Sequence, residues 1–153
     1  MKNKYIIGIV IILALLAISF IEYDRFHYVE FNGISIKLPF IVKESRSVKT
    51  INIRSIPFDG TSLSITNSSI DTNQFFNVYK NVKGEYLIDN KQIISRHGVT
   101  INIQIVGVEG AAQLKTVYGY IKDRPFYFTI TGSSGVIDEI LKRLDTVKVV
   151  ATP

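Results

Sequence analysis

The chain has 153 residues, with 18 Lys and Arg, 13 Asp and Glu, and no Cys. The absence of Cys excludes disulfide bonds, thiolate metal ligands and a lipid-modified N-terminal Cys. The formal net charge is +5, and it falls to +3 (16 basic against 13 acidic residues) when the two lysines at positions 2 and 4 are left out. This excess is too mild for a nucleic-acid-binding surface, so we expect no nucleic-acid partner.

The N-terminal part contains an uncharged run of 17 residues, Tyr5 to Ile21, in which twelve are Ile, Leu, Val or Phe. A helix of this length measures ~25 Å at ~1.5 Å per residue, which is near the short end of helices that cross a bilayer. The run therefore predicts a transmembrane helix over residues 5–21. A cleaved secretory signal is the alternative, because signals also combine a basic start with an apolar stretch.

The charges on either side of this run predict its orientation. Lys2 and Lys4 precede it, and positive charge stays on the cytoplasmic side of a membrane. Residues 1–4 are then cytoplasmic, and residues 22–153 form a single exported domain. We expect a single-pass protein of the bacterial inner membrane with its domain in the periplasm or on the extracellular face, because exported domains without disulfides are typical of bacterial envelopes.

Most of the exported part alternates between apolar and polar residues, which predicts half-buried strands. The predicted strands are Phe26–Phe31, Ile34–Leu38, Val48–Ile56, Leu63–Thr66, Val99–Val106, Leu114–Ile121 and Phe126–Thr131. Asn32-Gly33 and the segment 122–125 have the composition of hairpin turns. The segment Tyr86–Ser95 is ambiguous, and we expect it to be extended.

Two segments have the helical period instead, Asp71–Val82 and Val136–Val147. Ser133 or Ser134 is expected to cap the second helix. Each helix has one apolar stripe, which must cover a face of the sheet. The predicted fold class is therefore α+β: a mostly antiparallel sheet with two amphipathic helices, preceded by one N-terminal transmembrane helix.

Two parts of the chain resemble a known family. Gly33-Ile34-Ser35-Ile36-Lys37-Leu38-Pro39 resembles the opening strand of the PsbP/DcrB-like α-β-α sandwich family. Phe126–Thr131, the helix at 134–146 and the tail 147–149 resemble its closing strand, helix and strand. The resemblance covers about residues 31–150 and implies a binding, chaperone or accessory module with no catalytic residues to carry over. The chain lacks the Cys of the lipoprotein members.

Residues that would carry catalysis or bind a metal are sparse. His27 and His97 are far apart in the sequence and have no partners at metal-ligand spacing. The turn at 132–135 reads Gly-Ser-Ser-Gly, which lacks the spacing of a nucleophile elbow, and helix capping explains both serines. We therefore expect no enzyme activity, no metal and no cofactor.

The first candidate partner surface is a basic run that contains one acid. Its candidate binding residues are Lys43, Arg46, Lys49 and Arg54. Such a run attracts anionic lipid headgroups or an acidic protein. The alternative interpretation is a solvated loop and strand face.

The second candidate surface is an uncharged sheet face. Thr100, Asn102 and Gln104 alternate along one predicted strand, and Tyr127 and Thr129 alternate along another. Together they predict an open face, and Tyr is enriched at protein interfaces. The alternative is ordinary solvent exposure.

These observations predict a non-enzymatic, membrane-anchored envelope protein that acts by protein–protein contact. A concrete form is an immunity or inhibitor protein that blocks an incoming toxin or phage component. One alternative is an accessory subunit that stabilises another membrane protein, such as a sensor or a secretion or adsorption component. The other is a small-ligand or lipid-binding module with a pocket between helix and sheet. The sequence predicts neither the partner nor the oligomeric state.

Overall fold

The computed structural model describes residues 2–26, 28–38, 41–56, 61–68, 75–76 and 82–150. Side chains are described within these ranges except at 2–4, 20–26, 41–42 and 55–56. In chain order the elements are α1 (Lys2–Phe26), β1 (Val29–Phe31), β2 (Ile34–Ile36), β3 (Ile41–Arg46), β4 (Thr50–Ile56), β5 (Ser62–Asn67), β6 (Glu85–Ile94), β7 (Thr100–Val108), β8 (Leu114–Ile121), β9 (Phe126–Ser133), α3 (Ser134–Arg143), the 3-10 helix η2 (Leu144–Thr146) and β10 (Lys148–Val149).

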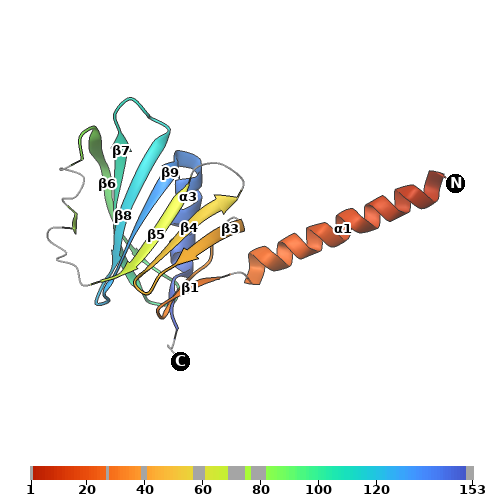
Figure 1. Ribbon diagram of the computed structural model, residues 1–153, viewed down its shortest axis with the longest axis horizontal. Coiled ribbons are helices and arrows are strands. Elements are labelled where there is room, and N and C mark those ends of the chain that lie inside the picture. The colour runs from red at the N-terminus through yellow and green to blue at the C-terminus, as the bar shows by residue number, and fades with distance from the viewer. Residues whose placement is uncertain are drawn as a thin grey trace.

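The strands form two antiparallel sheets (Figure 1). The main sheet has seven strands in the order β3-β4-β5-β9-β8-β7-β6, and the small sheet has three in the order β1-β2-β10. Every neighbouring pair is antiparallel, as the alternating sequence predicts. The ambiguous segment that we expected to be extended forms the long edge strand β6.

Each predicted strand overlaps an observed one, although the strand predicted to begin at Phe26 begins at Val29, because Phe26 belongs to α1. The strand β3 has no counterpart in the prediction. The last residues of β3 read Lys43-Glu44-Ser45-Arg46, with no apolar residue to alternate. The strand forms because its backbone completes the edge of the main sheet by pairing with β4 along its whole length. Periodicity cannot reveal a strand of this kind.

The predicted turn at Asn32-Gly33 joins β1 to β2. Asn32 has φ 46° and Gly33 has φ 82°. Positive φ at both central residues is the mark of a type I′ turn, whose twist matches that of the strands it joins. The turn sets the register Phe31↔Ile34 and Val29↔Ile36.

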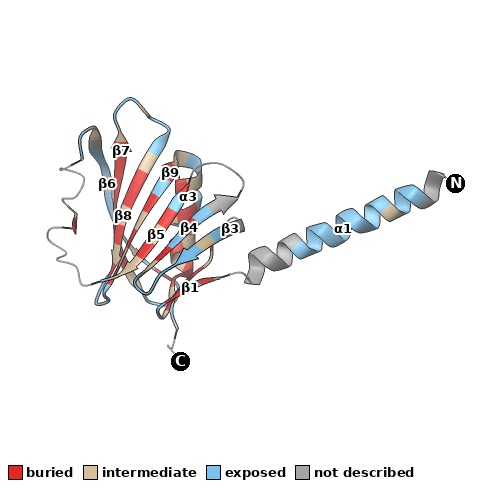
Figure 2. Cartoon of the chain, viewed as in Figure 1, coloured by how far each residue is buried: buried red, intermediate tan, exposed pale blue. Residues whose placement is uncertain are grey.

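The hydrophobic core lies between one face of the main sheet and a second layer formed by α3, η2 and the small sheet (Figure 2). The main sheet contributes every second residue of its inner strands, among them Ile51, Ile53, Leu63, Ile65, Ile101, Ile103, Val117, Phe128 and Ile130. The second layer contributes Ile137 and Ile140 of α3, Leu144 of η2, and Val29, Phe31, Ile34 and Ile36. Edge strands β3 and β6 are largely exposed, so the core is centred on β5, β9 and β8.

The predicted helix at Val136–Val147 appears as α3 followed by η2. Ser133 is the N-cap residue of α3, but its side chain makes no capping hydrogen bond. The Ser134 hydroxyl donates instead to the Gln113 carbonyl oxygen at 3.1 Å, which ties the start of α3 to the end of the loop before β8. The predicted helix at Asp71–Val82 lies outside the described residues except for Phe75, Phe76 and Val82.

The prediction of a transmembrane helix over residues 5–21 is wrong. In the described part of the chain, no helix is long and apolar enough to cross a membrane. A spanning helix needs about 20 predominantly apolar residues to match a hydrocarbon core of about 30 Å, whereas the uncharged run has 17. The helix α1 extends beyond the run to include Lys2 and Lys4 at one end and Asp24 and Arg25 at the other. It projects away from the two sheets (Figure 1), and its large apolar side chains from Tyr5 to Ile18 are 53–71% exposed.

Candidate functional site

The face of the main sheet opposite α3, here termed the outer face, carries three rows of cross-strand neighbours. The first row is Lys43, Arg54, Ser62, Thr131, Thr116, Val106 and Leu87. The second is Ser45, Asn52, Ser64, Thr129, Tyr118, Gln104 and Asn90. The third is Thr50, Thr66, Tyr127, Tyr120, Asn102 and Gln92. Lys43 and Arg54 are the only charged residues in these rows, and Glu85 lies on the same face at the opposite edge, on β6. The outer face is therefore mostly uncharged, with two cations at one corner.

All five residues predicted for an uncharged sheet face lie on the outer face, but they differ in accessibility. Gln104 is 3% exposed, so its side chain is not available to a partner. Asn102 accepts a hydrogen bond from Gln92 Nε2 at 3.0 Å. Thr100, Asn102, Tyr127 and Thr129 are half-buried. The face is therefore less open at β7 and β8 than alternation alone predicts.

Two aromatic residues from a distant part of the chain lie on the outer face. The ring centroid of Phe75 is 5.6 Å from that of Tyr127 and 6.1 Å from that of Tyr120. The ring centroid of Phe76 lies 5.2 Å from that of Tyr120. These contacts cover the third row at β8 and β9, and they account for part of the aromatic density in the sequence. No local pattern predicts them, because they join residues 44–52 positions apart.

A second cover on the outer face comes from Tyr118. Its phenol reaches from β8 to β6 and donates to a carboxylate oxygen of Glu85 at 3.1 Å. The side chains of Val106 and Thr116 on the same part of the face are buried. Burial, and then the negative charge of Glu85 and its hydrogen bond, raise the pKa of Tyr118 to about 12. The phenol is therefore protonated at neutral pH, donates to Glu85 and covers this part of the outer face.

Gln104 beside this pair has a polar atom without a partner. Its Nε2 donates to Asn90 Oδ1 at 2.9 Å, but its Oε1 makes no hydrogen bond. A buried acceptor left without a partner costs about 1–3 kcal/mol. Gln104 is therefore a point of local instability in the sheet.

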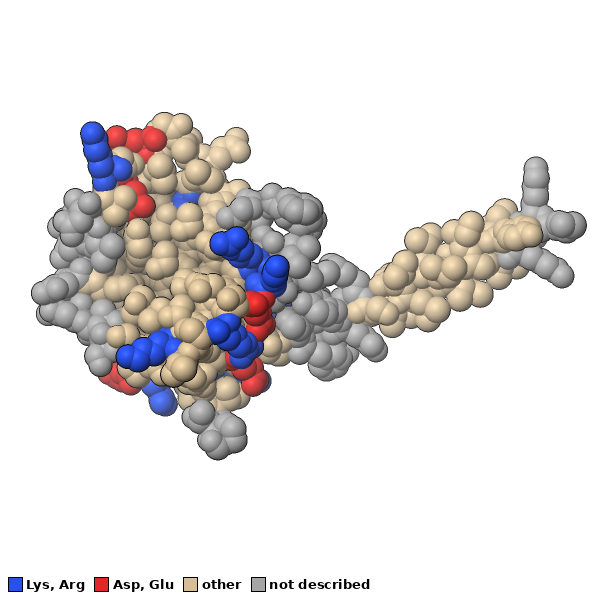
Figure 3. Space-filling view, viewed as in Figure 1, with Lys and Arg blue, Asp and Glu red and all other residues tan. Residues whose placement is uncertain are grey.

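The open part of the outer face lies over β3, β4 and β5. A hollow of about 430 Å³ is found there, lined by Lys43, Glu44, Ser45, Asn52, Ile53, Arg54, Ser62, Leu63 and Ser64. Figure 3 shows Lys and Arg side chains over β3 and β4 beside a broad surface with few charges. The residues lining the hollow whose side chains lie on the outer face are two cations, three serines and one asparagine, and all of them are hydrogen-bond donors.

The structure divides the predicted basic run into separate parts. Lys43 and Arg54 lie directly opposite each other and face the hollow. Arg46 belongs to the other face, where its Nε donates to Glu44 Oε2 at 2.8 Å and its Nη1 donates to the Glu30 carbonyl oxygen at 2.9 Å. Lys49 lies exposed in the turn between β3 and β4. Side chains at odd and even positions of a strand point to opposite faces. A prediction of β3 as a strand would therefore have placed Lys43 and Arg46 on opposite faces of the sheet.

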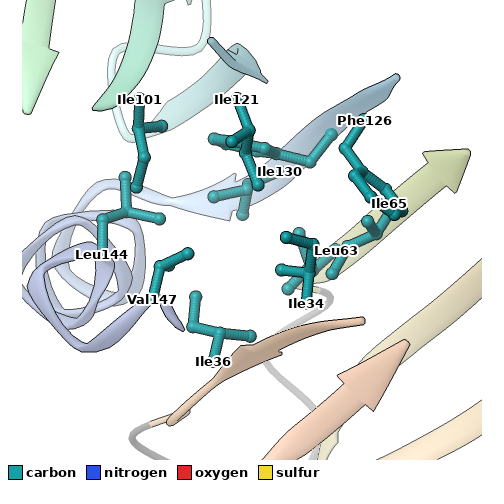
Figure 4. Close-up of a pocket in the computed structure, with 11 residues that line it drawn as sticks. Ile34, Ile36, Leu63, Ile65, Ile101, Ile121, Phe126, Ile130, Leu144 and Val147 are labelled. Atoms are coloured by element: carbon teal, nitrogen blue, oxygen red, sulfur yellow. The ribbon is translucent and has the colours of Figure 1, made fainter. Parts of the chain in front are cut away.

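The void that the described residues enclose between the two layers is too small for a ligand. Figure 4 shows apolar side chains around a void of about 20 Å³, lined by residues from the main sheet, β2, η2 and Val147. Ligand pockets usually have about 300–1,000 Å³. All of the lining side chains are hydrocarbon, so the void offers a water molecule no hydrogen-bond partner.

The histidines, the acidic residues and the serines of the turn at 132–135 were the sequence's candidates for metal binding or catalysis. In the described part of the chain, no three His, Asp or Glu side chains come together to hold a metal ion. His97 is exposed near the turn between β6 and β7. The Ser134 hydroxyl is used by its bond to Gln113.

Two comparisons with known proteins found no match. No family model matches it, and no curated protein is significantly similar to it. The resemblance to the PsbP/DcrB-like family stays a prediction.

Proposed function

We propose that this protein is a non-enzymatic binding protein that acts by protein–protein contact through the open part of its outer face. The observation that carries the proposal is the hollow over β3 to β5, where hydrogen-bond donors from three strands face solvent. Elsewhere the outer face is covered by Phe75, Phe76 and the pair of Tyr118 with Glu85. The rigid sheet beneath the hollow presents these donors in a fixed arrangement, which lowers the entropic cost of binding.

The place and the role of the protein belong to the same proposal. The basic start before the apolar run supports export, and the bacterial envelope is the compartment we propose. The concrete role is an immunity or inhibitor protein that binds an incoming toxin or phage component. A small domain with one recognition surface fits such a role, because blocking a partner requires contact alone. An accessory subunit would use the same surface on a resident protein.

Site-specific photo-crosslinking tests the proposal in cells of the source organism. A photoreactive amino acid at Ser62 or Thr131 on the outer face should capture a discrete protein. The matched control places the same group at Glu139, which is exposed on α3. Capture that is equal from both faces, or absent from the outer face, would count against a binding role for the outer face.

The timing of capture separates the two roles. An accessory subunit is crosslinked in an undisturbed pure culture, whereas an inhibitor is crosslinked only after exposure to competing strains or phage. Failure to capture a protein under both conditions would refute the proposed function.

A further inference from the structure

The cations of the hollow form a like-charge pair. Lys43 and Arg54 are directly opposite on neighbouring antiparallel strands and lie on the same face. Cβ atoms in such a pair are about 5 Å apart, and like charges in this arrangement are destabilising. Both side chains are exposed. Local arrangements that lower the stability of the fold, such as this like-charge pair, are expected mainly at functional sites.

Among the described residues, no acidic side chain forms an ion pair with Lys43 or Arg54. The ion pairs of the described residues join Arg46 to Glu44, Lys91 to Asp89, Arg96 to Asp145, Lys115 to Asp138 and Lys142 to Glu139. None of them includes Lys43 or Arg54. Glu44 borders the hollow, but its carboxylate is bound by Arg46 on the other side of β3. The two cations therefore remain available to an external anion.

The surroundings of the pair suit a carboxylate that is part of an extended chain. Arg pairs with carboxylates through two parallel hydrogen bonds, and Lys adds a point charge. The hollow of about 430 Å³ exceeds what one small anion fills. Its floor continues from Ser62 and Ser64 to the hydroxyls of Thr131 and Thr129, which can bond a peptide backbone. Two cations are too few to follow a nucleic-acid backbone.

We propose that this hollow binds an acidic peptide segment of the partner, with its carboxylates placed on Lys43 and Arg54. This inference rests on the proposed function and names the chemistry of the partner. The serine and threonine hydroxyls align the segment, and the two cations select for Asp or Glu side chains.

Calorimetric titration of the full-length protein, kept in solution with a mild nonionic detergent, tests this inference. The probes are hexaglutamate, hexaglutamine and inorganic phosphate. We expect hexaglutamate alone of the two peptides to bind, and the double variant Lys43→Gln with Arg54→Gln to weaken its binding about tenfold. The matched control, Lys49→Gln with Lys122→Gln, removes the same charge from exposed turns at the other end of the strands. This control variant should weaken the binding of hexaglutamate less than about threefold, because solvent ions screen the charges of Lys49 and Lys122 from a peptide bound in the hollow.

Three results would overturn the inference. The first is no binding of hexaglutamate. The second is an equal loss of affinity in both double variants, which would indicate a general charge effect. The third is phosphate binding that needs Lys43 and Arg54 while hexaglutamate does not bind, which would identify a site for a free anion. Circular dichroism of both double variants checks that they fold, and because both pairs are exposed we expect unchanged spectra.

The outcome can be separated from that of the proposed function. A partner that crosslinks from Ser62 but binds the Lys43→Gln, Arg54→Gln variant as tightly as the wild type would overturn this inference alone. Selective binding of hexaglutamate without any crosslinked protein would support the acidic-segment site and refute the protein partner.

Discussion

Replacement of Gly119 by Ala should destabilise the protein, because Phe128 occupies the space that a side chain would need. Gly119 on β8 is directly opposite Phe128 on β9. A Cβ atom at Gly119 would lie 2.2 Å from Cζ of the Phe128 ring and within 2.7 Å of two further ring atoms. Carbon atoms in contact are normally about 3.5–4.0 Å apart, so the ring or the strand must shift by more than 1 Å.

The size of the effect follows from two opposing contributions. Overpacking a core costs about 1–3 kcal/mol, and the contacts at Gly119 are severe enough to place the cost near the top of this range. Ala in a strand recovers about 0.5–1 kcal/mol of the entropy that Gly loses on folding. We expect the free energy of unfolding of Gly119→Ala to fall by about 2 kcal/mol, which corresponds to about 4–8 °C in Tm for a chain of this length.

Urea unfolding followed by circular dichroism measures the difference. Gly135→Ala is the matched control, because a Cβ at this helical position would meet no atom within 4 Å apart from its chain neighbours and the backbone of α3 itself. This substitution should stabilise α3 by about 0.5–1 kcal/mol. Phe128→Leu should reduce the cost of Gly119→Ala when the two are combined, with a coupling of about 0.5–3 kcal/mol. Wild-type stability of Gly119→Ala, or strict additivity of the pair, would refute this packing argument.

Three further predictions concern the sheet. Glu85→Gln should lower the pKa of Tyr118 from about 12 part of the way to the usual value near 10, measured by tyrosinate absorbance, because burial remains as the larger cause of the shift. Because the folded pKa is raised, the free energy of unfolding is highest below about pH 10 and falls as the pH rises to about 12. An unchanged titration would contradict the assignment of Glu85 as partner. Gln104→Leu should raise the free energy of unfolding by about 1 kcal/mol, since it removes an unpartnered buried acceptor at the loss of one hydrogen bond; a clearly destabilised variant in a urea titration would argue that Oε1 has a partner. Ile130→Ala, at a residue that is 0% exposed, should cost about 3–4 kcal/mol in the same titration, and a loss below about 1 kcal/mol would place Ile130 outside the tightly packed core.

The strands that bury one face could be predicted from the sequence, because alternation reports burial directly. Ile101, Ile103 and Ile105 of β7 are all buried, as their spacing predicts. The edge strand β3 could not be predicted in this way, since its pairing with β4 is a matter of backbone hydrogen bonds. The length and composition of the apolar run in α1 led to the wrong prediction of a transmembrane helix. The run is near the lower limit of length at which a helix can span a bilayer.

The candidate site could be predicted only in part. The sequence predicts that Tyr127 and Thr129 share a face, because they alternate with buried Phe128. It cannot predict that Phe75 packs on Tyr127, because this contact depends on how distant segments meet. The juxtaposition of Lys43 and Arg54 depends on the register of β3 against β4, which is fixed only in the folded sheet.

Covalent labelling of lysine side chains tests most directly the claim that the hollow on the outer face is the binding surface. The full-length protein is acetylated with and without the partner that is recovered by crosslinking, and the rates at Lys43 and Lys142 are compared by mass spectrometry. Lys142 is exposed on α3 and serves as the internal reference. We expect the partner to slow the labelling of Lys43 severalfold and to leave Lys142 unchanged. Unchanged labelling of Lys43 in a saturated complex, or protection of Lys142 alone, would contradict the proposed binding surface.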